Sequence, residues 1–317
     1  MERSRDLVAN RALGQPIRNK IRKTGVRMTK WTAADIPDQT GRTFVVTGAN
    51  SGLGASTARE LARAGASVIV ACRNTTKGAA AAAGMPGQVE VRQLDLADLA
   101  SVRSFADGVE HLDVLVNNAG VMALPKGTTA DGFECQIGTN HLGHFALTGL
   151  LLAKITDRVV TLSSGAHRFG KISLDDLNWQ RRRYQRWGAY GQSKLANLMF
   201  AYELQRRLAA TWSPLKSLAA HPGYAATKLQ SHTESVQDRL MVLGNRLIAQ
   251  SADLGALPSL YAATVATVRG GEFVGPDGRL GLNGHPKVVG SNRTSKDGAM
   301  AAKLWALSEE LTGVTFP

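Results

Sequence analysis

Short apolar runs alternate with helical stretches along most of this chain. From residue 42 onward, each β-branched run is followed by a segment with helical periodicity. Strands that are apolar throughout, each followed by a helix, are typical of a parallel sheet with helices on both faces. We predict one doubly wound α/β domain of the Rossmann type, with strands at 43–47, 67–72, 88–94, 113–116, 158–162 and 215–220.

Helices are expected between and after these strands, where apolar residues recur at helical spacing. The stretch 270–290 is rich in glycine and contains Pro276 and Pro286, so we expect a loop there. Predicted helices cover residues 55–64, 77–83, 99–109, 133–154, 189–208, 251–268 and 299–311.

The composition fits one large reduced domain. The chain has 317 residues, 44% of them hydrophobic, which is enough for a sizeable core. Cys72 and Cys135 are too few for a disulfide framework or a thiolate metal site, which favours a cytoplasmic location. Cys72 lies in an apolar run and is predicted to be buried. No stretch is long and apolar enough to cross a bilayer.

The formal charge of +13 is concentrated near the beginning of the chain. Residues 1–30 hold nine Lys or Arg against two acidic residues, a balance of +7. We interpret residues 1–40 as a solvated or partly disordered basic arm and 41–317 as the domain, and expect no nucleic-acid partner. Two alternatives stay open. Residues 1–27 could lie as a basic helix on an anionic membrane, or Met28 could be the true start.

A glycine-rich turn joins the first strand to the first helix. Residues 48–54 follow the pattern Gly-x-x-x-Gly-x-Gly, which lets the backbone turn sharply and approach a pyrophosphate at the helix N-terminus. This position indicates a dinucleotide site. The predicted contacts are Gly48, Asn50, Ser51, Gly52, Leu53 and Gly54.

The spacing of this turn resembles the short-chain dehydrogenase/reductase family, and the resemblance extends over residues 41–317. Three further segments follow the expected strands. Asp95 and Leu96 are similar to the family's adenine contact, and 117–120 to its Asn-Asn-Ala-Gly signature. The segment from Pro222 to Thr227 is similar to the one that holds the nicotinamide. The resemblance implies cofactor contacts at Asp95, Leu96, Asn118, Ala119, Gly120, Tyr190, Lys194, Pro222, Gly223 and Thr227.

The catalytic residues are also identified through this resemblance. Tyr190 and Lys194 share a helix face at i and i+4. Tyr190 is expected to be the general acid/base. Lys194 and the positive charge of the oxidised nicotinamide are expected to lower its pKa, and Lys194 to contact the cofactor ribose. Ser164, preferred over Ser163, would hydrogen-bond the substrate oxygen. Asn140 is similar to the family residue that positions a water for proton transfer to Lys194.

An insertion at about 173–188 separates Ser164 from Tyr190 and resembles the retinol-dehydrogenase branch, expected here as a soluble, bacterial member. We expect Trp179, Tyr184 or Trp187 to line the entrance for a bulky apolar substrate. The basic and aromatic cluster 181–187 leaves four alternatives: an exposed solvated loop, a lid at the substrate entrance, a contact for an acidic ligand, or a single-stranded nucleic-acid surface.

The end of the second strand predicts the cofactor. None of residues 71–76 is acidic, and Arg73 offers a planar cation that suits a 2′-phosphate. Asn74 and Thr75 could add neutral donors. We therefore predict NADP(H) in preference to NAD(H), although the glycine-rich turn carries no second basic residue.

The expected function is NADP(H)-dependent interconversion of a ketone or aldehyde and an alcohol by hydride transfer, in a homodimer or higher homo-oligomer. The alternative is a redox sensor that binds NADP(H) without turnover. His141 and His144 share a helix face, but we interpret them as packing residues and expect no metal site. Asp175 and Asp176 are interpreted as loop or cap residues.

Overall fold

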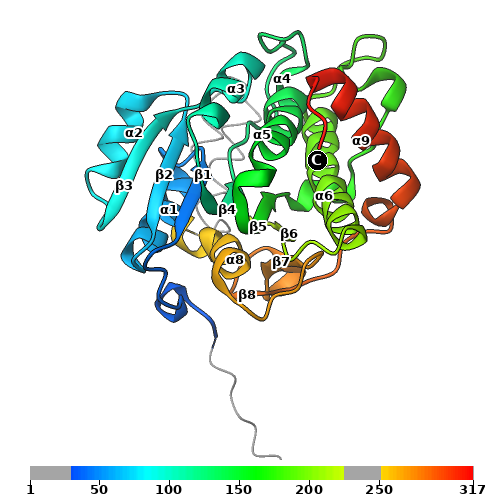
Figure 1. The fold of residues 1–317 in the computed structure, drawn as a ribbon. Helices are drawn as coiled ribbons and strands as arrows, with labels where there is room; N and C mark the ends of the chain where they lie inside the picture. The colour runs from blue at the N-terminus through cyan, green and yellow to red at the C-terminus, as the bar shows by residue number, and fades with distance from the viewer. Residues whose placement is uncertain (1–29, 225–250, 317) are drawn as a thin grey trace, which may run out of the picture. The chain divides into compact units, whose positions relative to one another are not determined.

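A single sheet organises the part of the chain that the computed structural model describes, residues 30–224 and 251–316. Its strand order is β3-β2-β1-β4-β5-β6-β7-β8, with every neighbouring pair parallel except β7 and β8 (Figure 1). This arrangement confirms the predicted doubly wound fold. The strands are β1 (Thr43–Thr47), β2 (Ser67–Cys72), β3 (Gln88–Gln93), β4 (Leu112–Asn117), β5 (Ile155–Leu162), β6 (Lys216–Ala220), β7 (Phe273–Pro276) and β8 (Pro286–Val288).

Helices cover both faces because the strands are apolar on both sides. On β1, Phe44 and Val46 pack into the core beneath α1 and α8, while Val45 packs into the core beneath α3, α5 and α6. Helix α9 packs on α5 and α6. The helices are α1 (Gly52–Arg63), α2 (Thr75–Ala82), α3 (Leu99–Asp107), α4 (Cys135–Ile137), α5 (Gly143–Leu151), α6 (Arg186–Ala210), α8 (Ala252–Thr264) and α9 (Gly298–Thr312).

The expected loop at 270–290 was wrong, because it contains β7 and β8. Phe273 and Val274 are buried and extend the sheet beside β6, with Ala219 opposite Phe273. Strand β8 then pairs antiparallel with β7. Pro286, which cannot donate to a ladder, begins this last strand of the sheet, where proline is tolerated. Glycine and proline content alone therefore hid two short strands.

The predicted continuous helix at 133–154 is divided. A π-helical turn, Gly138–Leu142, lies between α4 and α5, and a 3₁₀ turn, Leu152–Lys154, follows α5. The amide of Gly143 bonds to the carbonyl of Gly138, five residues back. Helix α6 begins at Arg186, so Tyr190 lies one turn inside the helix and not at its beginning.

The packed unit begins at Trp31, before the boundary predicted at residue 41. The Trp31 ring packs edge-on against Tyr261 at 5.2 Å, and its carbonyl pairs with His285 Nδ1 at 2.9 Å. The basic segment 1–29 and the predicted contact Thr227 lie outside the described residues. Among the described helices, none combines the length and apolarity needed to span a membrane.

Candidate active site

Two adjoining cavities lie at the carboxyl edge of the sheet, where ligands collect in doubly wound folds. The larger holds about 1240 Å³ and the smaller about 830 Å³. Leu53, Asn118, Gly120 and Met122 line both cavities. They meet where the loops after β1 and β4 come together, so one extended ligand can occupy the two.

The smaller cavity is lined by the predicted adenosine and pyrophosphate contacts. Gly48 has a φ of +65°, and a Cβ there would stand 2.9 Å from Ala119. The close approach of the two loops thus requires glycine. Asn118 Nδ2 donates to the carbonyl of Thr47 at 2.7 Å, which ties the loops together. The lining includes Gly48, Asn50, Ser51, Gly52, Leu53, Gly54, Arg73, Asp95, Leu96, Asn118, Ala119 and Gly120.

Sequence reasoning missed a second cation in this cavity. Lys77 follows Arg73 by four residues, and both line the cavity and are exposed. Asn74 caps α2 by accepting a hydrogen bond from the Lys77 amide at 2.8 Å, which fixes the turn between them. Within the described ranges neither cation forms an ion pair. The spacing of four residues between Arg73 and Lys77, where a helix was predicted to begin, could have indicated this second cation.

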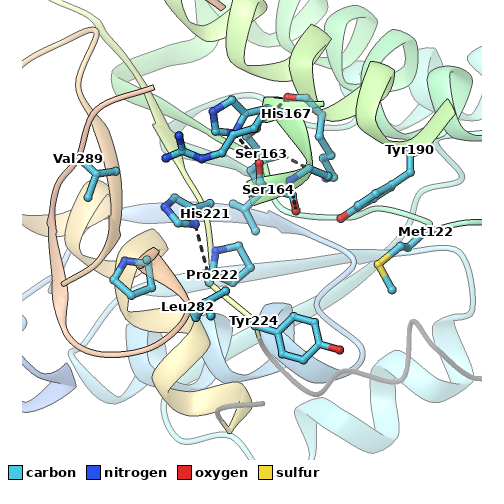
Figure 2. Close-up of a pocket in the computed structure, with 18 of the residues that line it drawn as sticks. Met122, Ser163, Ser164, His167, Tyr190, His221, Pro222, Tyr224, Leu282 and Val289 are labelled. Atoms are coloured by element: carbon cyan, nitrogen blue, oxygen red, sulfur yellow. Dashed lines mark hydrogen bonds between the residues drawn. The ribbon is translucent and has the colours of Figure 1, made fainter. Parts of the chain in front are cut away.

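Tyr190 and Lys194 lie on the face of α6 that borders the larger cavity. Both side chains are buried, and Figure 2 shows the Tyr190 ring beside Ser164. Lys194 Nζ lies 5.9 Å from the Tyr190 ring centroid and donates to the carbonyl of Leu162 at 3.2 Å. The phenol and the ammonium group therefore face the same space.

The two candidate serines have different roles in the structure. Ser163 is buried and its hydroxyl donates to the carbonyl of Lys194 at 2.8 Å, so it packs β5 against α6. The Ser164 hydroxyl instead accepts from the Ala166 amide at 3.3 Å and lines the larger cavity beside Tyr190. Of the two, Ser164 is therefore the serine placed beside the phenol.

Asn140 lies in the π-helical turn and is buried. Its Nδ2 donates to the Val121 carbonyl and to Ser193 Oγ, both at 2.9 Å, and its Oδ1 accepts from the Val121 amide at 2.7 Å. A Cβ on Gly120 would stand 3.2 Å from Asn140 Oδ1 and 3.3 Å from Lys194 Nζ. Asn140 thus fixes the loop after β4 immediately beside Lys194.

Burial sets the charge states of the pair. Burial raises the pKa of the Tyr190 phenol, and the neighbouring Ser164 hydroxyl lowers it. Burial also lowers the pKa of Lys194 to about 8. The expected lowering of the Tyr190 pKa by Lys194 is not produced by the protein groups alone, because desolvation dominates. At neutral pH the protein holds Tyr190 as a phenol, able to donate a proton.

The insertion mainly packs against α6 and supports it. Trp179 is buried under the Arg182 guanidinium, 3.6 Å from its ring centroid, and Arg182 also bonds to Gln192 of α6. The Tyr184 hydroxyl donates to Leu124 O at 3.0 Å, away from the cavity. Only Trp187, of the three aromatics expected at the entrance, lines the larger cavity. Trp179 does not line the entrance because it packs under the Arg182 guanidinium.

The paired residues considered for metal or carboxylate chemistry have protein partners. His141 Nε2 pairs with Ser308 Oγ at 3.0 Å, and His144 Nδ1 with the Asn140 carbonyl at 3.0 Å. Asp176 Oδ1 accepts from the Gln180 amide at 2.7 Å, as a cap residue does. Cys72 is buried in β2, as predicted.

The comparisons with known proteins identify the class. Residues 42–238 match the model of the short chain dehydrogenase family. The chain belongs to this family of oxidoreductases. Human retinol dehydrogenase 13 is 44% identical over 297 residues, covering 87% of this chain and 86% of the relative. Human retinol dehydrogenase 12 is 41% identical, with 86% and 87% covered. These relatives place the chain in the retinol-dehydrogenase-like branch.

Solved structures agree with the fold. An uncharacterized protein from Mycobacterium paratuberculosis is 60% identical, with a TM-score of 0.81 over 91% of this chain and 100% of that one. An NAD(P) dependent gluconate 5-dehydrogenase from Beutenbergia cavernae, solved with NADP at low occupancy, is 25% identical. Its TM-score is 0.57 over 74% of this chain and 95% of that one.

Proposed function

We propose that this chain is an NADP(H)-dependent oxidoreductase that interconverts a bulky, mainly apolar carbonyl compound and its alcohol. The observation that carries the proposal is the position of Ser164, Tyr190 and Lys194. All three line a cavity of about 1240 Å³ that adjoins the glycine-rich cofactor cavity. Relatives named retinol dehydrogenase support the reaction class.

In the proposed mechanism, Tyr190 is the group that moves the proton. The bound dinucleotide supplies the hydride. As the substrate carbonyl carbon is reduced, Tyr190 donates its phenolic proton to the carbonyl oxygen. Ser164 donates a hydrogen bond to the same oxygen and stabilises the negative charge that develops there. Lys194 stabilises the phenolate left on Tyr190, and oxidation of the alcohol reverses these steps.

The lining of the two cavities supports the cofactor proposal. Arg73 and Lys77 would hold a 2′-phosphate, and residues 71–77 contain no carboxylate that would repel it. Lys194 would contact the ribose of the nicotinamide half. Pro222 and Gly223, which line the larger cavity, would lie beside the nicotinamide, together with Thr227.

Apolar side chains at the larger cavity support a bulky substrate. Five large hydrophobic residues with more than a third of their surface exposed line it: Phe169, Trp187, Leu280, Leu282 and Val288. An apolar body that covers them is removed from water favourably, whereas a small aliphatic aldehyde covers few of them. Retinoids, which the relatives' names indicate, are one such class.

Turnover of all-trans-retinal, dodecanal and acetaldehyde with NADPH tests the proposal. We expect the two long aldehydes to be reduced much faster than acetaldehyde, and Tyr190→Phe to reduce none. NADPH binding without turnover of any carbonyl compound or alcohol would contradict the enzyme and favour the redox sensor.

Assembly and location are further parts of the proposal. We infer a homodimer or larger homo-oligomer, because short-chain dehydrogenases typically oligomerise. We also infer a cytoplasmic location. Light scattering at micromolar concentration and cell fractionation test them, and a monomer or a membrane-bound protein would contradict the respective inference.

A further inference from the structure

The larger cavity carries positive charge without a matching carboxylate. Arg168, Arg186 and Lys287 line it, and among the described lining residues none is Asp or Glu. Their side chains form no ion pair or hydrogen bond within residues 30–224 and 251–316. Exposed cations are ordinarily solvated, so their presence alone identifies nothing. The buried groups beside Arg168 are more informative.

Two buried histidines lie beside Arg168. His167 follows β5 and His221 follows β6, and both rings pack against Phe273 at 5.6 and 5.0 Å between centroids. Burial lowers the pKa of both imidazoles, and the charge of Arg168 lowers them further. In the view of Figure 2, Ser164 lies between the two histidines and Tyr190. The cluster therefore lines the same cavity as Tyr190, on the other side of Ser164.

Hydrogen bonds at the Nδ1 atoms of His167 and His221 determine whether each Nε2 is a donor or an acceptor. His167 Nδ1 pairs with the Ser164 carbonyl at 2.6 Å, and because a carbonyl only accepts, Nδ1 carries the proton. The remaining Nε2 is a buried acceptor with no partner in the described chain. His221 Nδ1 accepts from the Gly223 amide at 3.3 Å, so its Nε2 is a donor. A free donor, a free acceptor and a guanidinium thus belong to residues that line one cavity.

We propose that Arg168, His167 and His221 form an anion subsite that binds a carboxylate at the remote end of the carbonyl substrate. Arg168 donates to the carboxylate as a planar fork, and His221 Nε2 donates to it as well. On binding, His167 takes up a proton from the solvent and donates Nε2–H to the carboxylate, which satisfies the buried nitrogen. The inference rests on the proposed function and deepens it: the preferred substrate is amphipathic, with an apolar body and one acidic end.

A wholly apolar substrate fits this cavity less well. It would cover the exposed Arg168 guanidinium without returning the hydrogen bonds that water gives it, and an unmatched polar group costs free energy when buried. A carboxylate returns those bonds. The exposed apolar residues around the cavity still accommodate the chain between the two ends.

The kinetic test compares two aldehydes that differ only at the remote end, 12-oxododecanoate and its methyl ester, with NADPH. Loss of a hydrogen bond to a charged group costs about 1.5–3 kcal/mol, so we expect kcat/KM to be about 10- to 100-fold higher for the acid. Arg168→Leu should remove this preference by lowering kcat/KM for the acid toward the value for the ester. Lys171→Leu, at an exposed cation outside the cavity lining, is the matched control. Equal kcat/KM values in wild type would overturn the subsite.

Gly275 gives a second test that leaves Arg168 in place. A Cβ on Gly275 would stand 2.0 Å from His221 Nε2, so Gly275→Ala must displace the imidazole or the strand. We expect it to reduce the acid preference, with ester reduction and the unfolding temperature reporting whether the domain stays intact. An intact Gly275→Ala variant with the full acid preference would remove His221 from the subsite.

Calorimetry separates failure of the subsite from failure of the reaction. Decanoate and decanamide, which differ in charge at one end, are titrated into wild type and Arg168→Leu in the presence of NADP⁺. Tighter binding of decanoate than of decanamide by wild type, but not by Arg168→Leu, supports the subsite even if neither aldehyde is reduced. Absence of aldehyde reduction would contradict the proposed reaction only. Equal binding of the two probes by wild type would overturn the subsite whether or not the aldehydes are reduced.

Discussion

The imidazole of His144 accepts a hydrogen bond from the hydroxyl of Thr47 over 2.9 Å. The direction follows from the other side of the ring, where Nδ1 donates to the Asn140 carbonyl. Burial lowers the pKa of His144 to about 3, so the ring is neutral at neutral pH and Nε2 can only accept. Thr47 Oγ1 also accepts from the amides of Asn118 and Ala119, both at 2.9 Å. One neutral imidazole therefore connects the cofactor loops to Asn140.

His144→Phe should break this connection while filling a similar volume. It leaves the Thr47 hydroxyl and the Asn140 carbonyl without their ring partner, so we expect NADPH affinity and kcat each to fall by about tenfold. His141→Phe is the matched control, because His141 is also buried but pairs with Ser308 of α9. The measurements are the NADPH dissociation constant, kcat and the unfolding temperature. Equal losses of affinity in both variants would show that His144 acts only through stability.

Tyr190→Phe should remove nearly all turnover and leave the NADPH dissociation constant close to that of wild type. The substitution deletes the proton donor but keeps the buried ring against α6. General acid catalysis contributes roughly 10²- to 10⁴-fold, so the residual rate should be at most about 1%. The check is steady-state reduction of the best long aldehyde, with cofactor fluorescence for binding. A Phe variant with near-normal kcat would disprove the assignment of Tyr190.

Much of this architecture could be predicted from the sequence, because the central strands are apolar on both faces and are followed by amphipathic helices. Strands β1 and β2 lie at the predicted residues. Residues in the backbone turn after a strand, such as Gly48, could also be predicted from the sequence. Short strands such as β7 were not, because four residues with Gly275 and Pro276 carry no distinctive periodicity and pair only through tertiary contact.

Roles that depend on which way a side chain points were harder to predict. Trp179 and Trp187 are both aromatic residues of the insertion, yet one packs under Arg182 and the other borders the cavity. Nothing in their spacing separates them. His167 and His221 lie 54 residues apart and meet only because β5 and β6 are neighbours that end at the same edge. Sequence motifs located the edge of the sheet, and tertiary packing decided what faces it.

Buried neutral histidines should make the protein sensitive to mild acid. Burial lowers the pKa to about 4 for His141, about 3 for His144 and about 4 for His221. Their unfolded pKa is near 6.5, so below this pH the unfolded chain binds protons that the folded chain does not, and stability falls. The loss is about 2 kcal/mol for each histidine at pH 5.

Urea unfolding at pH 7, 6 and 5 measures this slope. His141→Gln should lower stability at pH 7 but flatten the decline toward pH 5 by about one histidine's share, because one fewer proton is taken up on unfolding. His111→Gln, at an exposed histidine, is the matched control and should keep the wild-type slope. A stability that stays constant from pH 7 to pH 5 would contradict the burial of these rings.

The choice between NADPH and NADH should depend on two cations and not on one. Arg73 and Lys77 line the same end of the smaller cavity, and within the described part of the chain neither is neutralised by an ion pair. A charge-assisted hydrogen bond is worth about 1.5–3 kcal/mol, so each contact should contribute about tenfold to a hundredfold in NADPH affinity. Lys77→Ala should therefore weaken NADPH binding and leave NADH binding unchanged, whereas Lys303→Ala on α9 should change neither.

Arg73→Asp should go further and reverse the preference. The new carboxylate would repel a 2′-phosphate and accept hydrogen bonds from the ribose hydroxyls of NADH. Because Lys77 remains, the reversal should be incomplete, and Arg73→Asp combined with Lys77→Ala should favour NADH more strongly than the single variant. The measurement is the dissociation constant of NADPH and of NADH for wild type, Lys77→Ala, Arg73→Asp and the double variant. All are measured at one ionic strength, since salt screens such contacts. Equal affinities in wild type, or a double variant that still binds NADPH more tightly, would show that the 2′-phosphate is not recognised at the end of β2.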